Sequence, residues 1–256
     1  MRRYWAPAEC FQNDEVRIRG DLLHHIRDVC RQQKGARFEV IGTNGKAHLV
    51  EIITESKNES IARILEMRVI PELPRPYVHL ALSVPRFTVF EAVLEKAVEL
   101  GVKSIKPFFS DFSFIRARED VFQNKLKRFE KIVISATQQS GRGDLMVIEK
   151  PVGIEEALQT FGRDSGKTGS GQAAGLFAFE GQGVLSAREG LGKVRACQPT
   201  DVWIFAGSEG GFSAREVELF KTFDLQAVTL GGQVLRVETA CVALVSIIKY
   251  DLDLMR

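Results

Sequence analysis

Two segments in the C-terminal part of the chain share one plan, and that plan limits the fold more than any other sequence feature. Residues 201–206, DVWIFA, and 225–230, LQAVTL, are apolar runs of strand length, and each leads into a glycine-containing loop. A helix-like pattern follows each loop, from Ser213 and from near Val237. Strands alternating with helices predict an α/β domain with a mostly parallel sheet. Because the carboxyl ends of parallel strands face one crevice, we expect the two loops to form one binding site.

Further apolar runs extend this pattern. They predict strands at 79–84, 104–110 and 175–179, and helical periodicity predicts helices at 88–101 and 125–139. Gly101 is a natural end for the first of these helices. The last segment, 237–250, is apolar nearly all round, which is typical of a helix buried in a core or a subunit interface. Residues 162–175 are rich in glycine and serine and are predicted to be a flexible insertion.

The N-terminal part has a different pattern, of short β-rich runs at 36–42, 46–53 and 60–70. Asn44-Gly45 predicts a hairpin between the first two runs. One helical piece is expected at 21–31. These features favour a small β-barrel or sandwich. Three prolines within 71–76 predict a stiff linker, and hence one domain over 1–72 and a second over 77–256.

Composition narrows the class of protein. The chain has 256 residues, is 45% hydrophobic and carries a formal net charge of +2, which fits a globular protein with a sizeable core. Its four cysteines are scattered, so neither a zinc ribbon nor a redox motif is indicated, and we expect no metal. The N-terminus lacks the apolar stretch of a signal peptide, and no run could span a bilayer. We expect a soluble, cytoplasmic protein.

The first glycine loop, GSEGGFSAREV, is open to several interpretations. Ser213 and Glu216 have capping-box spacing, which predicts that the helix begins at Ser213 and that the glycines lie outside it. The glycine spacing is not that of a dinucleotide fingerprint, and Glu209 would repel a phosphate. A neutral or cationic ligand fits better, and a plain tight turn is the alternative. Gly-Lys-Thr at 166–168 lacks the preceding glycine of an NTPase loop, because Phe161 stands there, so that class remains a distant alternative.

Residues 1–37 carry eight Lys or Arg and five Asp or Glu, with Tyr4, Trp5 and Phe11 interleaved. Positive charge with aromatic side chains favours an RNA-binding face, because cations contact phosphates and aromatic rings stack on bases. A solvated face over a small core is the alternative.

Several motifs also resemble those of one known family. GSEGGFSAREV resembles G-P-E-G-G-[LF]-[ST]-x-x-E, and LGGQVLRVETA resembles L-G-x-x-[IV]-L-R-x-E-T-A. FEAVLEKAVELGVKSIKP, KIVISATQQSGR and HIRDVCR resemble three further segments, in the family's order along the chain. Together they identify the chain as similar to the 16S ribosomal RNA uridine-N3 methyltransferases, RsmE, of the SPOUT superfamily. The chain has Ser208 where the family usually has Pro, and Gly232-Gln233 where it usually has Pro-Arg.

The resemblance implies an α/β SPOUT-type parallel sheet with a C-terminal deep trefoil knot, preceded by a small PUA-like β-barrel. It implies binding of S-adenosylmethionine at the knot, a homodimer formed through the knot domain, and methylation of N3 of one uridine, U1498 in the family, in 16S rRNA of the small ribosomal subunit. Two alternatives remain: a SPOUT enzyme that modifies tRNA or a ribose 2′-hydroxyl, and a non-catalytic RNA-binding homologue.

The resemblance also implies site residues. Arg236 is expected to stabilise the uridine anion, and Glu209 and Glu238 are candidate bases. Cofactor contacts are expected from three loops, at Phe179, Glu180, Gly181, Gly207, Ser208, Gly210, Gly211, Leu230, Gly231, Gly232 and Leu235. RNA contacts are expected at Arg2, Arg3, His25, Arg27, Arg31, Arg86, Ser140, Gly141 and Arg142.

Overall fold

The computed structural model describes residues 1–115, 119–166, 172–181 and 184–255, and it divides into two compact units. The first unit comprises Met1–Glu72 together with Ile134–Leu145, and the second comprises Leu73–Val133 and Met146–Arg256. The short segment 134–145 therefore groups with the N-terminal residues, which the sequence patterns did not indicate.

The first unit is built on a six-stranded sheet with the order β1-β4-β5-β6-β3-β2. The predicted hairpin is confirmed: Ile41 pairs with Ala47 in antiparallel register, and Gly45 takes a left-handed φ of 70° in the turn. The expected helical piece is present as α1 (Gly20–Leu23), which continues into η2 (His24–Val29). The strands are β1 (Arg3–Ala6), β2 (Phe11–Gln12), β3 (Glu15–Arg19), β4 (Arg37–Gly42), β5 (Lys46–Glu55) and β6 (Glu59–Val69), with η1 (Ala8–Cys10) between β1 and β2.

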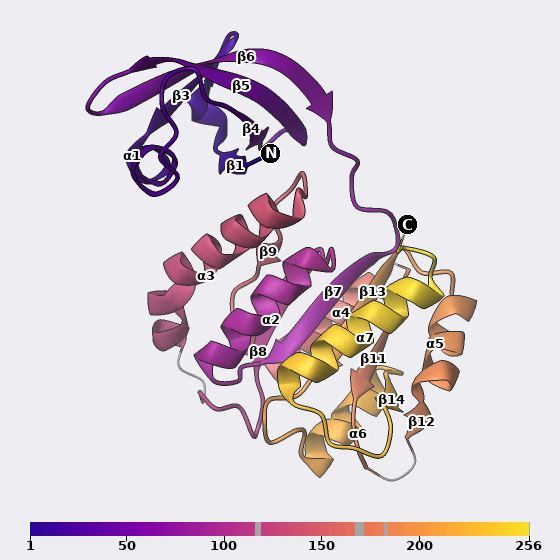
Figure 1. Ribbon diagram of the computed structural model, residues 1–256. Helices are drawn as coiled ribbons and strands as arrows, with labels where there is room; N and C mark the ends of the chain where they lie inside the picture. Colours follow the sequence, from indigo (N-terminus) through magenta and orange to yellow (C-terminus); the bar gives the residue numbers. More distant parts are fainter. Residues whose placement is uncertain (116–118, 167–171, 182–183, 256) are drawn as a thin grey trace. The chain divides into compact units, whose positions relative to one another are not determined.

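The second unit is an α/β domain around a sheet with the order β10-β8-β7-β13-β11-β14-β12, and β9 pairs with β8 (Figure 1). Every strand pair described in this sheet is parallel, so the predicted parallel sheet is confirmed. The strands are β7 (Tyr77–Ser83), β8 (Ser104–Phe109), β9 (Val147–Ile148), β10 (Val152–Gly153), β11 (Ala173–Ala178), β12 (Leu185–Ser186), β13 (Asp201–Ala206) and β14 (Gln226–Thr229).

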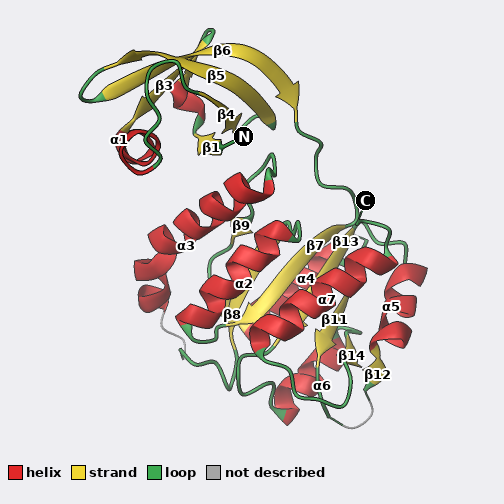
Figure 2. Ribbon diagram, viewed as in Figure 1, coloured by secondary structure: helices red, strands yellow, loops and turns green. Residues whose placement is uncertain are grey.

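Helices cover both faces of this sheet (Figure 2). On one face α2 and α7 pack against each other, and α7 lies over β13. On the other face Phe161 of α4 and Phe220 of α6 pack into a cluster with Phe177 and Phe205 of the sheet. The helices are α2 (Phe87–Glu99), α3 (Glu119–Ser140), α4 (Ile154–Asp164), α5 (Ala187–Ala196), α6 (Ala214–Thr222) and α7 (Val237–Asp251).

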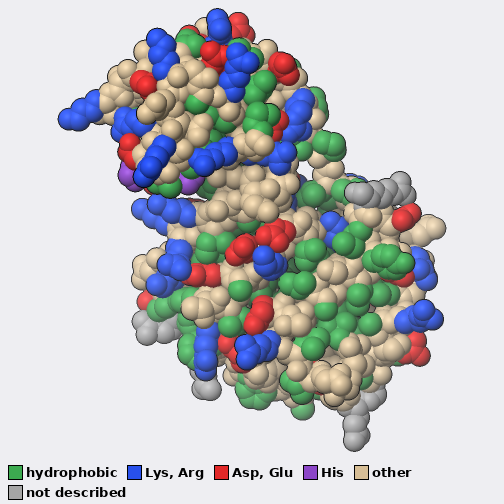
Figure 3. Space-filling view, in the orientation of Figure 1, with side chains coloured by type: hydrophobic (Ala, Val, Ile, Leu, Met, Phe, Trp, Pro, Cys, Tyr) green, Lys and Arg blue, Asp and Glu red, His purple; other side chains and the backbone are tan. Residues whose placement is uncertain are grey.

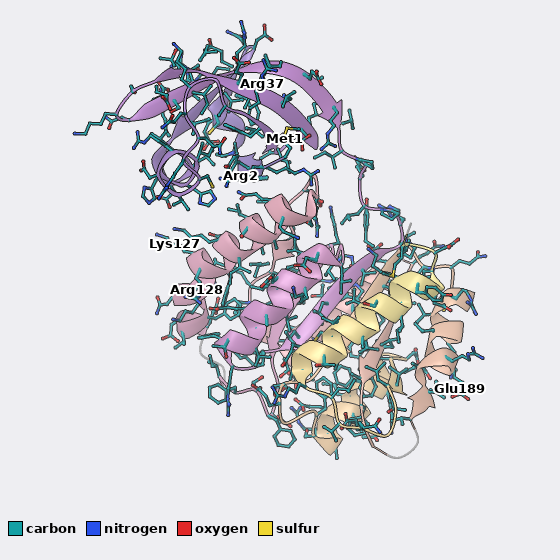
Figure 4. All side chains as sticks on the ribbon, in the orientation of Figure 1. Met1, Arg2, Arg37, Lys127, Arg128 and Glu189 are labelled. Atoms are coloured by element: carbon teal, nitrogen blue, oxygen red, sulfur yellow. The ribbon has the colours of Figure 1, made fainter. Side chains whose placement is uncertain are left out.

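Two sequence interpretations change. The insertion predicted over 162–175 is shorter, because α4 runs through Asp164 and β11 begins at Ala173. Residues 167–171, with most of the Gly-Lys-Thr match, lie outside the described residues. The sequence patterns also missed α5, although its start carries a readable signal: Ser186 and Glu189, the latter labelled in Figure 4, form a capping box.

The capping box predicted at α6 is confirmed. Ser213 Oγ accepts a hydrogen bond from the Glu216 N–H at 3.3 Å, and the Glu216 carboxylate accepts from the Ser213 N–H at 2.9 Å. The same carboxylate also accepts from the Asp111 N–H, at 2.8 Å, while Glu216 is fully buried. One side chain therefore joins the start of α6 to the loop that follows β8.

Replacing Glu216 should reveal this junction. We expect Glu216→Ala to lower the free energy of unfolding by about 2 kcal/mol, because the backbone N–H groups of Ser213 and Asp111 lose their acceptor. Glu218→Ala is the matched control on the same helix, since Glu218 is exposed and its ion pair among the described residues is with Lys221, and its effect should stay within about 0.5 kcal/mol. Urea denaturation of both variants measures the difference, and equal losses would contradict the assignment.

Candidate functional site

A cavity of about 400 Å³ lies at the carboxyl ends of β11, β13 and β14. Its walls come from the loops that follow these three strands and from the first turns of α7. The two glycine loops thus meet at one site, as the parallel arrangement predicts. A volume of this size is within the usual range for small-molecule pockets, roughly 300–1,000 Å³.

Most of the residues expected to contact a cofactor line this cavity. They are Phe179, Glu180, Gly181, Gly207, Ser208, Gly210, Gly211, Leu230 and Leu235. Gly231 and Gly232 are exposed and are not part of the lining. Sequence reasoning missed the apolar side chains Phe212, Val228, Val234 and Val237, which also line it. Their only sequence signal is that they flank the loops.

The charged side chains among the described lining residues are both acidic, Glu180 and Glu209. Acidic groups raise the local concentration of cations and repel phosphates. Glu180 also joins two of the loops, because its Oε1 accepts a hydrogen bond from the Leu235 N–H at 3.3 Å. The lining therefore suits a ligand with an apolar body and a positive charge.

The loop 207–212 is held by specific contacts. Ser208 Oγ donates to the Phe112 carbonyl at 2.6 Å, and Ser208 is buried. Gly211 has a φ of 68°, which favours glycine. A Cβ on Gly207 would lie 2.9 Å from the Gly211 Cα, so the two glycines allow this loop to fold back on itself.

The three candidate catalytic residues do not occupy equivalent positions. Glu209 lines the cavity, is exposed, and accepts a hydrogen bond from the Arg86 N–H at 3.3 Å. Arg236 is the exposed N-cap residue of α7. Glu238 is half-buried in the first turn of that helix, where a negative charge also stabilises the helix dipole. Neither Arg236 nor Glu238 belongs to the cavity lining.

Many Lys and Arg side chains lie on the face of the first unit seen in Figure 3. Arg2, labelled in Figure 4, donates to the Cys30 carbonyl at 2.9 Å. Arg3 pairs with Glu39 at 2.8 Å, and the hydrogen bond from Arg68 is the main cause that lowers the pKa of that carboxyl group. Arg27 hydrogen-bonds to Asp28 and holds the pKa of the Asp28 carboxyl group at about 2.

The remaining RNA candidates are more varied. The His25 ring packs edge-on against Tyr4, and Arg31 has a left-handed φ of 55° that follows the η2 turn. Arg142 is buried and paired with Asp144 at 2.9 Å, so its charge is already compensated. The two residues before it, Ser140 and Gly141, are at the end of α3 and in the turn that follows.

Two other features bear on function. Among the described residues, no group of three or more His, Cys, Asp or Glu is arranged to hold a metal ion. None of the described helices combines the length and apolar character needed to cross a membrane.

Comparison with known proteins gives a consistent result. The family model of an RNA methyltransferase domain matches residues 71–249, and that of an RNA methyltransferase PUA domain matches 18–65. The ribosomal RNA small subunit methyltransferase E of Mesomycoplasma hyopneumoniae (strain 232) is 30% identical over 88% of this chain and 89% of its own. That of Bacillus subtilis (strain 168) is 27% identical over 100% of this chain and 99% of its own.

A solved structure agrees with these relatives over nearly the whole chain. It is the ribosomal RNA small subunit methyltransferase E from Neisseria gonorrhoeae bound to S-adenosyl methionine, with a TM-score of 0.80 and 28% identity. The match covers 98% of this chain and 97% of that one. From the domain match and these relatives together, the chain belongs to the ribosomal RNA small subunit methyltransferase E family of RNA methyltransferases.

Proposed function

We propose that this protein is an S-adenosylmethionine-dependent methyltransferase that methylates N3 of one uridine in 16S rRNA, U1498 by family analogy. The observation that carries the proposal is the cavity at the ends of β11, β13 and β14, which has an apolar and acidic lining. It lies in the domain that matches the RNA methyltransferase family. The Neisseria gonorrhoeae relative bound to S-adenosyl methionine supports the choice of cofactor.

The residues present fit this cofactor. Phe212, Val228 and Leu235 supply apolar surface for an adenine ring, and Glu180 and Glu209 supply negative charge for a sulfonium. A Cβ built on Gly211 would meet nothing within 4 Å, which shows open space beside the loop. Because Gly211 carries no side chain, that open space and the neighbouring backbone groups remain accessible to a ligand. When bound, S-adenosylmethionine supplies a methyl group on a positively charged sulfur that an in-line nucleophile can displace.

The chain must make uridine N3 into a nucleophile, because this nitrogen carries a proton at neutral pH. Glu209 is the base candidate that lines the cavity, so we assign it the removal of that proton. Arg236, exposed at the start of α7, is assigned to stabilise the negative charge that the deprotonated base spreads over O2 and O4. Glu238 is assigned a supporting role at the helix N-terminus.

The finer architecture belongs to the same proposal. The chain is divided into a PUA-like β-barrel over 1–72 and a SPOUT domain over 77–256 with a deep trefoil knot near the cavity. Two copies associate through the knot domain. The first unit binds the rRNA through the basic residues of 1–37, and the protein acts in the cytoplasm. Support comes from the motif resemblance, from the PUA-domain match at 18–65 and from the fold shared with the Neisseria relative.

The glycine loop should control cofactor binding. Gly207→Ala places a Cβ 2.9–3.1 Å from backbone atoms of Gly211, so the loop must shift away from its cavity-lining conformation. We expect the affinity for S-adenosylmethionine, measured by calorimetry, to fall about tenfold or more. Gly192→Ala is the control, because its Cβ meets nothing within 4 Å on α5 and should slightly stabilise the fold. Unchanged cofactor affinity in Gly207→Ala would refute the loop's assignment.

Arg236 should act on the chemical step. We expect Arg236→Ala to slow single-turnover methyl transfer to 16S rRNA about 100-fold while the cofactor affinity stays close to wild type. Arg163→Ala is the charge-matched control, because Arg163 is exposed in the last turn of α4. In cells that lack the protein, N3-methyluridine should disappear from 16S rRNA, return with wild type and stay low with Arg236→Ala. A methylation pattern that the deletion leaves intact would overturn the proposed function.

A further inference from the structure

Two phenylalanines are exposed on the loop that follows β8. The exposed fraction is 48% for Phe112 and 58% for Phe114. Such exposure leaves apolar area in water, and exposed apolar patches often mark interaction sites. Neither side chain belongs to the cavity lining, so the cofactor site does not account for their exposure.

The backbone of residues 110–114 is held by specific contacts. Phe114 N–H donates to the Val84 carbonyl at 3.0 Å, and the Phe112 carbonyl accepts from Ser208 Oγ at 2.6 Å. Ser113 is buried, and its Oγ accepts from the Ser110 N–H at 2.8 Å. Together with the Asp111–Glu216 bond, these contacts fix the main chain while the two rings face solvent. The rings are therefore presented by a rigid support.

The loop also lies against the candidate methyl-transfer site. A Cβ built on Gly210, which lines the cavity, would lie 2.7 Å from Phe112 Cβ. Glu209, the next residue of the lining, accepts a hydrogen bond from the Arg86 N–H. Phe112 and Arg86 thus each lie next to a residue that lines the cavity.

Arg86 adds a positive charge to this surface. Its guanidinium carbon lies 5.0 Å from the centre of the Phe114 ring, in a cation–π arrangement. Within the described part of the chain, no carboxylate lies at ion-pair distance from that guanidinium. An aromatic face beside an arginine is the pairing that recognises an unpaired nucleotide, because the base stacks on the ring and the phosphate meets the cation.

We propose that Phe112, Phe114 and Arg86, here named the aromatic rim, bind an unpaired nucleotide of the RNA substrate at the mouth of the cavity. Phe112 and Phe114 stack on nucleobases, and Arg86 contacts the connecting phosphate. This inference rests on the proposed function, and it identifies the substrate there as single-stranded RNA. Stacking holds the nucleotides around the target uridine beside the cofactor cavity.

The test compares RNA with and without bases. The full-length protein is titrated with a short oligouridylate and with an oligomer of equal length whose residues are abasic. Phe112→Leu/Phe114→Leu keeps apolar bulk but removes both aromatic faces, and Phe112→Tyr/Phe114→Tyr keeps the faces. We expect the leucine pair to bind oligouridylate at least about tenfold more weakly than wild type. The tyrosine pair should remain close to wild type, and all three proteins should bind the abasic oligomer equally.

The proposed aromatic rim would be overturned if the leucine and tyrosine pairs bound oligouridylate equally, or if the wild type showed no preference for base-bearing RNA. It would also be overturned if light scattering showed a dimer for the wild type and the tyrosine pair but not for the leucine pair. The last result would assign the rings to a second copy of the chain. Methyl transfer to 16S rRNA, measured in parallel, tests the proposed function separately. If binding depends on the bases but no methyl transfer occurs, the aromatic rim stands and the proposed function is refuted. If methyl transfer occurs but the leucine pair binds oligouridylate as well as the wild type does, the function stands and the rim is refuted.

Discussion

The buried carboxylate of Glu216 is the interaction on which the candidate site depends. It accepts hydrogen bonds from Ser213, at the start of α6, and from Asp111, in the loop after β8. A carboxylate withdrawn from water is stable only when its oxygens are satisfied, so it holds both backbones in place. The wall of the cavity at 207–212 leads directly into Ser213, and Phe112 follows Asp111. One buried side chain therefore helps to hold both the cavity wall at 207–212 and the Phe112 end of the aromatic rim.

The parts of this structure that the sequence predicted depend on short-range patterns. The strands β13 and β14 are visible as apolar runs because a strand covered on both faces needs apolar side chains throughout. The start of α6 is visible because its capping residues, Ser213 and Glu216, are three positions apart. The convergence of the glycine loops follows from parallel strand direction alone. Each of these inferences needs only neighbours in the sequence and a general rule of geometry.

The parts that could not be predicted depend on partners far apart in the chain. Nothing in the pattern of β13 shows that it pairs with β7 on one side and β11 on the other. Nor does the composition of 134–145 show that this segment groups with the N-terminal residues. In the sequence Ser208 is only a small polar residue in a loop; the structure shows that its hydroxyl group donates a hydrogen bond to the Phe112 carbonyl. Family resemblance alone points to Arg236 and Glu238, and neither lies in the cavity lining.

The close approach of Gly210 to Phe112 has a consequence for how such proteins diverge. The two positions belong to different loops, yet they compete for one volume, since a Cβ at 210 would lie 2.7 Å from the phenylalanine side chain. A homologue that gains a side chain at 210 must therefore carry glycine at 112 or move that loop, because the nearest atom is the Cβ that every other residue has. Substitutions at 210 and 112 should then be correlated among homologues, which couples the cofactor loop to the proposed RNA-binding loop.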